Sequence, residues 1–138
     1  MREITPKLWI GNALEARDLR AVLNLGIEAI VDLAIEEPPV SPTRELIYHR
    51  VPLSDGQGNL PSRIRLAVNT VVELVASGTP TVVACSAGMS RSPSIVAAAL
   101  SQVSKITLDE ALQQAASAGP SDVSPALLAD IAAVLEDL

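Results

Sequence analysis

One short segment of the chain combines a nucleophile, a flexible residue and a cation at spacings that suit phosphate chemistry. It holds the only cysteine, Cys85, with a glycine three residues later and an arginine six residues later. Gly88 permits backbone angles that side chains disfavour, so the backbone N–H groups between Cys85 and Arg91 can converge on one point. Arg91 adds a planar fork of donors that matches two phosphate oxygens. The segment predicts a cradle for a tetrahedral dianion with sulfur at its base.

The same cradle is expected to activate the sulfur. Converging N–H groups, a helix N-terminus and an arginine all favour the thiolate form of Cys85, which is the nucleophilic form. Ser92 follows the arginine, and its hydroxyl is expected to hydrogen-bond the sulfur and help it leave. The phosphate group would be bound by the loop that connects them, which comprises Ser86, Ala87, Gly88, Met89, Ser90 and Arg91.

A structural role is the competing interpretation of Cys85. A lone cysteine is often a small buried hydrophobic residue. Such a residue needs no arginine, no glycine and no helix start at these positions, so the pattern favours a reactive thiol.

The flanking elements are those that a phosphate loop requires. Residues 81–84 are short, apolar and β-branched, which is typical of a buried central strand. Pro93 lies where a first helical turn tolerates proline, and the apolar stretch 94–104 predicts a buried helix. A strand would therefore deliver Cys85, and a helix would begin just after Arg91.

The remaining pattern alternates strands with helices. Asn12–Glu15 has the spacing of a capping box and predicts a helix that ends at Gly26, and Thr107–Glu110 repeats the spacing. Strands and further helices are predicted at residues 7–10, 27–33, 46–53, 61–78 and from 124 to the C-terminus. This order predicts an α/β fold with a central, mostly parallel, four- to five-stranded sheet flanked by helices.

Length, charge and composition bound the function. The 138 residues predict a single domain, 1–138, and 49% apolar residues suffice for a core. A net charge of −6 argues against nucleic-acid and membrane partners, which basic proteins favour. One cysteine excludes an internal disulfide and a cysteine-rich metal site. No apolar run is long enough to span a bilayer, so we expect a cytoplasmic protein. We also expect a monomer.

The segment resembles the Cys-x5-Arg-Ser signature of the protein tyrosine phosphatase superfamily, and the layout is similar to its dual-specificity branch. Residues 8–11 resemble that family's opening strand, and residues 51–55 its strand-to-loop segment with the general acid. The resemblance implies a metal-free and cofactor-free hydrolase of phosphorylated proteins or other phosphomonoesters. It implies Cys85 as nucleophile, Arg91 and the amides of 86–91 as phosphate binders, Asp55 as acid and then base, and Ser92 as helper.

Two positions depart from the family pattern. Ala84 precedes the nucleophile where histidine is common, and Gly119 precedes Pro120 where arginine is common. The general acid also has alternatives. Asp55 and Gly56 could form only a turn, since Asp-Gly is a frequent turn pair. Asp32, at a strand end, is the weaker competitor.

Other residue types are interpreted as structural. Glu36 and Glu37 are expected to be a solvated charge pair, and His49, the only histidine, a strand residue away from the thiol. Two other functions remain open: a rhodanese-like sulfurtransferase, which also uses a loop cysteine, and a phosphate-binding module with impaired catalysis. An arsenate-reductase-like cycle would need a resolving thiol, which this chain lacks.

Overall fold

Strands and helices follow one another in the predicted order. The structure is a computed structural model that describes all of residues 1–138. The strands are β1 (Arg2–Thr5), β2 (Leu8–Gly11), β3 (Ala29–Ala34), β4 (Ile47–Leu53) and β5 (Thr81–Ala84). The helices are α1 (Ala13–Arg17), α2 (Leu19–Asn24), α3 (Pro61–Ala76), α4 (Arg91–Ser104), α5 (Leu108–Ser117) and α6 (Pro125–Glu136).

The five strands form one sheet in the order β1-β2-β5-β3-β4. β2, β5, β3 and β4 run parallel, and only β1 pairs antiparallel, with β2. The predicted mostly parallel sheet is therefore confirmed. β5 occupies the centre and is buried along its whole length, so the cysteine that follows it emerges at the carboxyl edge of the sheet, where ligands bind in such folds.

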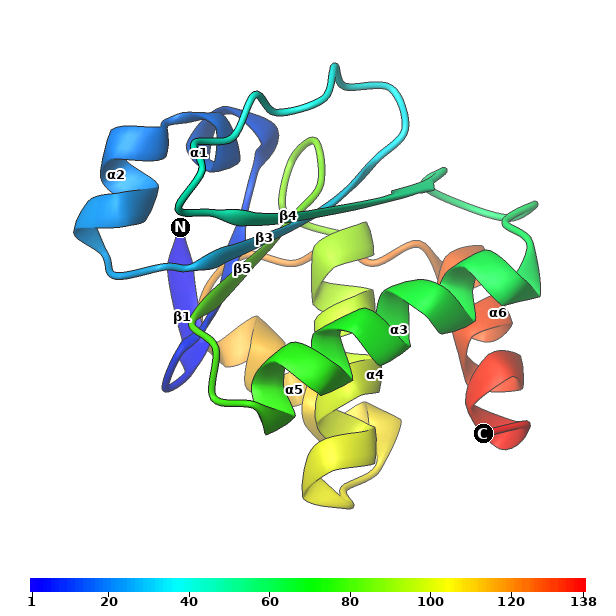
Figure 1. The fold of residues 1–138 in the computed structure, drawn as a ribbon. Coiled ribbons are helices and arrows are strands. Elements are labelled where there is room, and N and C mark those ends of the chain that lie inside the picture. Colours follow the sequence, from blue (N-terminus) through cyan, green and yellow to red (C-terminus); the bar gives the residue numbers. More distant parts are fainter.

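Helices cover both faces of the sheet. Figure 1 shows α1 and α2 on one side and α3 to α6 on the other. The larger core, of 25 buried residues, lies beneath α3 to α6, and the smaller core of 8 lies beneath α1 and α2. In α4 every side chain from Ile95 to Leu100 is buried, including three consecutive alanines. Small side chains let α4 lie close to the sheet, which compensates for the absence of phenylalanine.

The structure corrects three local predictions. The helix predicted up to Gly26 is two helices, because Asp18 ends α1 and caps α2 by accepting a hydrogen bond from the Ala21 amide. The capping box at Asn12 is confirmed, whereas Thr107 makes only its half of the second one. β1 was not predicted: its polar sequence has no strand periodicity, and pairing with β2 supplies its hydrogen bonds.

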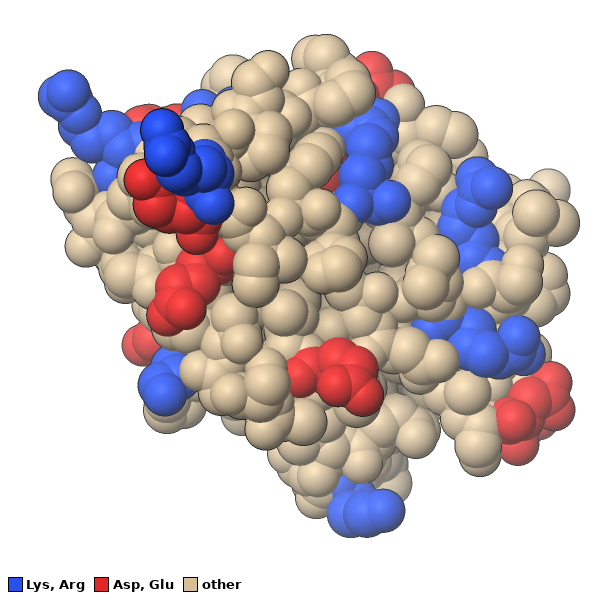
Figure 2. Space-filling model, viewed as in Figure 1, with Lys and Arg blue, Asp and Glu red and all other residues tan.

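The charged side chains form no continuous basic stripe on the face drawn in Figure 2. Lysine and arginine groups on that face are separated by uncharged surface and by acidic groups. In addition, no helix combines the length and the apolar character required to cross a membrane.

Candidate active site

The loop between β5 and α4 turns tightly at a glycine and packs against β2 and the start of α1. Gly88 has a φ of 72°, and a Cβ there would lie 3.0 Å from the backbone oxygen of Gly11. A side chain at this position would therefore be strained and would also press on β2. The glycine lets the loop turn tightly against the start of α1, where the Ala13 amide donates to the Ser86 carbonyl.

Three backbone carbonyls of the loop accept hydrogen bonds from residues that lie outside it. Ser86 oxygen accepts from Ala13 N at 3.1 Å, Gly88 oxygen from Arg2 Nη2 at 2.9 Å, and Met89 oxygen from Asp122 N at 2.7 Å. In a planar trans peptide the next N–H points opposite to the carbonyl, so the following amides face the other side of the loop. None of the backbone N–H groups of residues 86–91 donates to a backbone carbonyl. These amides remain available to bind an anion.

Cys85 lies at the base of this ring and is only 2% exposed. Its sulfur accepts a hydrogen bond from the backbone N–H of Ser92 at 3.5 Å. We expected the Ser92 hydroxyl to make this contact, but that buried hydroxyl has no hydrogen-bond partner. The reason is geometric: the first amides of α4 point along the helix axis toward the sulfur. The preceding Ala84 is fully buried in the smaller core.

Arg91 is fixed by three hydrogen bonds. Nη1 donates to Glu36 Oε1 at 2.6 Å and to the Leu53 carbonyl at 2.8 Å, and Nη2 donates to Glu36 Oε2 at 2.7 Å. Burial opposes the charge of Arg91, but the bonds and the negative charge of Glu36 outweigh it and raise its pKa. A guanidinium has five N–H groups. The two that are left, on Nε and Nη2, lie side by side along one edge and can bind two oxygens of one phosphate.

Glu36 and Glu37 are more than a solvated pair, which corrects the prediction: Glu36 is half exposed, yet both carboxylates accept hydrogen bonds from the phosphate loop. The hydrogen bond from Arg91 lowers the pKa of Glu36 to about 2. Glu37 Oε2 accepts from the Ser86 hydroxyl at 2.9 Å. A signal was present in the sequence: both residues follow β3, and the carboxyl ends of neighbouring parallel strands share one edge of a sheet.

Asp55 lies across the loop from the thiol. Its Oδ1 accepts from the Ser90 hydroxyl at 2.7 Å, and the same Ser90 oxygen accepts from the backbone N–H of Ser124 at 2.9 Å. The loop after β4 is therefore joined through Ser90 to the phosphate loop and to the start of α6. The interpretation of Asp55 as a turn residue alone leaves this contact unexplained.

These residues surround one cavity of about 310 Å³. Its lining comprises Glu36, Asp55, Cys85, Ser86, Ala87, Met89, Ser90, Arg91 and Asp122. Most of the predicted site thus meets in one place, although Gly88 and Ser92 support it without lining it. Asp32 is absent from the lining: it is fully buried and accepts hydrogen bonds from Arg17, Tyr48 and Arg50. His49 lines a separate cavity with residues of α3.

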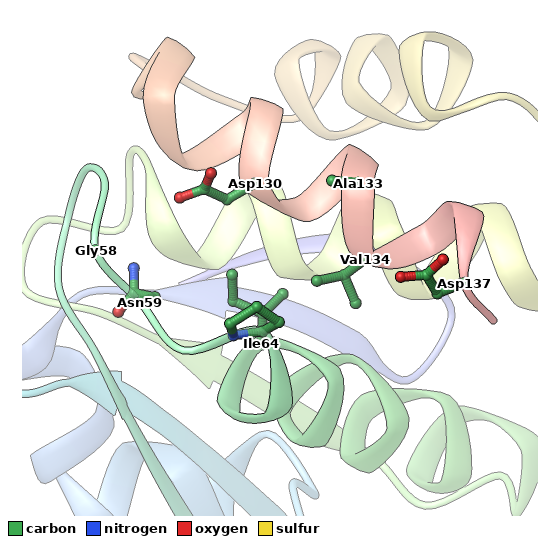
Figure 3. A pocket seen from close by; sticks show the side chains of 8 residues that line it. Gly58, Asn59, Ile64, Asp130, Ala133, Val134 and Asp137 are labelled. Atoms are coloured by element: carbon green, nitrogen blue, oxygen red, sulfur yellow. The ribbon is translucent and has the colours of Figure 1, made fainter.

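A second cavity, of about 350 Å³, lies between the loop before α3 and helix α6. Figure 3 shows Asn59 and Ile64 on one side and Asp130, Val134 and Asp137 on the other. The amide of Asn59 already bonds to Ser54 and Gly56. This cavity contains no nucleophile and no arginine.

Comparisons with known proteins identify the class of protein to which the site belongs. The model of the family described as the dual specificity phosphatase catalytic domain matches residues 8–126, which include the whole phosphate loop and Asp55. The chain is 30% identical to dual specificity protein phosphatase 5 of Rattus norvegicus over 112 residues, which are 80% of this chain and 29% of the rat protein. It is 30% identical to dual specificity protein phosphatase 2 of Mus musculus over 111 residues, 79% and 34% of the two chains.

Solved structures agree on the fold. Human DUSP28 superposes with a TM-score of 0.87 at 22% identity, covering 99% of this chain and 96% of the human one. A mouse putative dual specificity phosphatase, solved with zinc tungstate, superposes with a TM-score of 0.87 at 25% identity, covering 99% and 87%. The chain therefore belongs to the dual specificity phosphatase catalytic domain family. It spans about a third or less of the length of the curated relatives named above.

Proposed function

We propose that this chain hydrolyses phosphomonoesters through a phosphocysteine intermediate on Cys85. The observation that carries the proposal is the set of donors around the sulfur: the free amides of residues 86–91 and the unoccupied edge of Arg91. Donors fixed before the substrate arrives can stabilise the charge on the phosphoryl oxygens throughout the reaction. Neither a sulfurtransferase nor a module without catalysis accounts for Asp55 beside this ring, and the family match favours neither.

In the first step the Cys85 thiolate attacks phosphorus and the bond to the ester oxygen breaks. Asp55 donates its proton to that oxygen, so the leaving group departs as an alcohol and Asp55 becomes a carboxylate. Arg91 and the loop amides hold the three other oxygens. The product of this step is a phosphoryl group bonded to the sulfur.

In the second step water replaces the sulfur. The Asp55 carboxylate takes a proton from water while its oxygen bonds to phosphorus, and the sulfur leaves as a thiolate. The amide of Ser92 already donates to the sulfur and stabilises that thiolate. The Ser92 hydroxyl, which has no other partner, can turn to donate a second hydrogen bond. The enzyme then returns to its starting state.

Phosphorylated proteins are the substrate class that we propose first, with other phosphomonoesters as alternatives. The mouse relative was solved with zinc tungstate, and tungstate is a tetrahedral oxyanion like phosphate. The chain has only two aromatic residues, Trp9 and Tyr48, and neither lines the cavity. Selection for phosphotyrosine by ring stacking is therefore not expected.

Trapping the intermediate tests the proposal directly. Rapid acid quenching of the Asp55→Ala variant during turnover of p-nitrophenyl phosphate should yield protein with one added phosphoryl group, and peptide mapping should place it on Cys85. The variant slows the second step, so the intermediate accumulates. A phosphoryl group on any other residue, or a burst of product without labelled protein, would overturn the mechanism.

The proposed chemistry also bears on where and in what form the chain works. A catalytic thiol must stay reduced, so we propose a reducing compartment such as the cytoplasm. We also propose that the chain acts as a monomer. Light scattering coupled to gel filtration measures the oligomeric state.

A further inference from the structure

Arg2 is a partly buried cation that the proposed reaction does not use. It lies on β1, and its Nη2 donates to the carbonyl of Gly88 at 2.9 Å and to the carbonyl of Pro120 at 3.0 Å. One guanidinium thus joins the N-terminal strand, the phosphate loop and the segment before α6. Arg2 does not line the catalytic cavity, so it contacts the loop without contacting the substrate.

The space around Arg2 excludes a side chain at position 119. A Cβ on Gly119 would lie 2.3 Å from Arg2 Cδ and 2.8 Å from Arg2 Nε. Gly119 has no left-handed backbone angle that would itself require glycine. The absence of a side chain at 119 is therefore explained by the arginine that occupies the space.

The charge of Arg2 is coupled to the site. Desolvation lowers the pKa of Arg2, while the negative charges of Glu15 and Cys85 act in the opposite direction. The other charged groups that face the thiol are Arg91 from α4 and the acids that line the cavity, Glu36, Asp55 and Asp122. Arg2 is thus the second cation of a site in which acids outnumber bases.

We propose that Arg2 is a positioning residue of this active site, which holds the phosphate loop through Gly88 and supports the Cys85 thiolate with its charge. This role of Arg2 rests on the proposed function, because it assumes that the loop binds phosphate. The reason is the geometry of the peptide between Gly88 and Met89. Arg2 holds the Gly88 carbonyl on the outer side of the loop, so the Met89 N–H of the same planar peptide points to the inner side, where phosphate would bind. Without Arg2, the Gly88–Met89 peptide loses its external partner and the ring loses part of its preorganisation.

Alkylation of Cys85 provides a test that requires no turnover. Iodoacetate reacts with the thiolate of the single cysteine, and tungstate should protect it by filling the cradle. Arg2→Ala should weaken protection by tungstate roughly tenfold, the loss expected for a charged hydrogen bond. It should also raise the pH of half-maximal alkylation by roughly half a unit, as expected for one partly screened charge. Arg20→Ala is the matched charge control, because Arg20 is an exposed residue of α2 that makes no side-chain hydrogen bond or ion pair in the fold.

Gly119→Ala tests the same idea without altering Arg2. The new methyl group should displace the flexible arginine and weaken tungstate protection about as much as Arg2→Ala, with thermal unfolding little changed. In an Arg2→Ala background, Gly119→Ala should have no further effect, because nothing is left to displace. Arg2→Lys keeps the charge but not the planar group, so it should retain the alkylation pH while losing part of the protection.

The outcomes separate this inference from the proposed function. If Arg2→Ala behaves like Arg20→Ala, or if the effects of Arg2→Ala and Gly119→Ala add, the role of Arg2 is refuted. If the unaltered protein is not protected by tungstate, both the cradle and the role of Arg2 fail. If protection responds to Arg2 as expected but no phosphoester is hydrolysed, the role stands and only the proposed catalysis fails.

Discussion

The two main cavities of this protein are similar in size but differ in chemistry. The catalytic cavity measures about 310 Å³, and the one between the α3 loop and α6 about 350 Å³. The first has a buried thiol and a buried arginine whose remaining donors face no protein partner. The second is lined by Ile64, Val134 and carboxylates at its edge (Figure 3). Volume therefore does not identify the site.

The difference arises from the elements that form each cavity. The catalytic cavity lies at the carboxyl edge of the central strand, where a helix N-terminus and the ends of parallel strands converge. The other cavity lies between the loop before α3 and one side of α6, away from the carboxyl edge of the sheet. Only the first of these two cavities contains a thiol and an arginine. Substitutions in the two cavities should therefore have very different effects.

The largest effect is expected at the nucleophile. Cys85→Ser should lower phosphatase activity by at least roughly 10⁴-fold, because a hydroxyl is far less ionised than a thiol at neutral pH. Activity of the unaltered chain should survive EDTA, since Arg91 and the loop amides bind the phosphate in the proposed mechanism. Turnover of p-nitrophenyl phosphate measures both. Retained activity in the variant, or activity restored by divalent ions after chelation, would contradict the mechanism.

Substitution of Asp55 should have the second-largest effect on turnover, and its size should depend on the leaving group of the substrate. Asp55→Ala should reduce turnover of an alkyl phosphate roughly 10²- to 10⁴-fold. It should reduce turnover of p-nitrophenyl phosphate much less, because p-nitrophenolate leaves without a proton, provided that cleavage of the P–O bond limits both rates.

The matched control is Asp122→Asn, which alters another carboxylate of the same cavity. It should change turnover of the two substrates by the same factor. Equal losses on both substrates in Asp55→Ala would assign the proton donor elsewhere.

Substitution of Glu36 should affect catalysis less than that of Asp55, and it should also lower the stability of the fold. Glu36→Gln should raise KM roughly 3- to 10-fold, because Arg91 loses a charged partner that is itself half exposed. The pKa of Glu36 is about 2 against an ordinary 4.5, so its pairing stabilises the fold above pH 4.5. That stabilisation is lost as the pH falls from about 4.5 through about 2.

Thermal unfolding of the two proteins across this range measures the effect. The difference in Tm between the unaltered chain and Glu36→Gln should be largest near neutral pH and should shrink below pH 4.5. A difference that stays constant down to pH 2.5 would show that the Arg91 pair does not stabilise the fold.

The smallest effect is expected in the second cavity. Asp130→Asn should change kcat/KM less than about twofold and the free energy of unfolding by less than about 0.5 kcal/mol, as at ordinary surface positions. Steady-state kinetics and thermal unfolding check this. A tenfold fall in kcat/KM would mean that this cavity is coupled to catalysis, and the contrast between the two cavities would fail.

Much of the site was predictable because its key residues are adjacent in the chain. Cys85, Gly88 and Arg91 lie within one loop, and a β-branched strand and an apolar helix flank it, so local rules place them together. The alternation of strands and helices likewise indicates a mostly parallel sheet. The resemblance to a family favoured Asp55 as the general acid, since its own neighbours fit a turn equally well.

The tertiary structure alone decided which distant residues complete the site. Glu36 reaches Arg91 across 55 positions of sequence, and Arg2 reaches Gly88 across 86. Such contacts depend on strand order and on the path of loops, which leave no periodic signal in the sequence. Sequence determines the chemistry of the phosphate loop because that chemistry is local. The support of the loop is non-local, and only the folded chain brings Arg2, Glu36 and Asp122 to it.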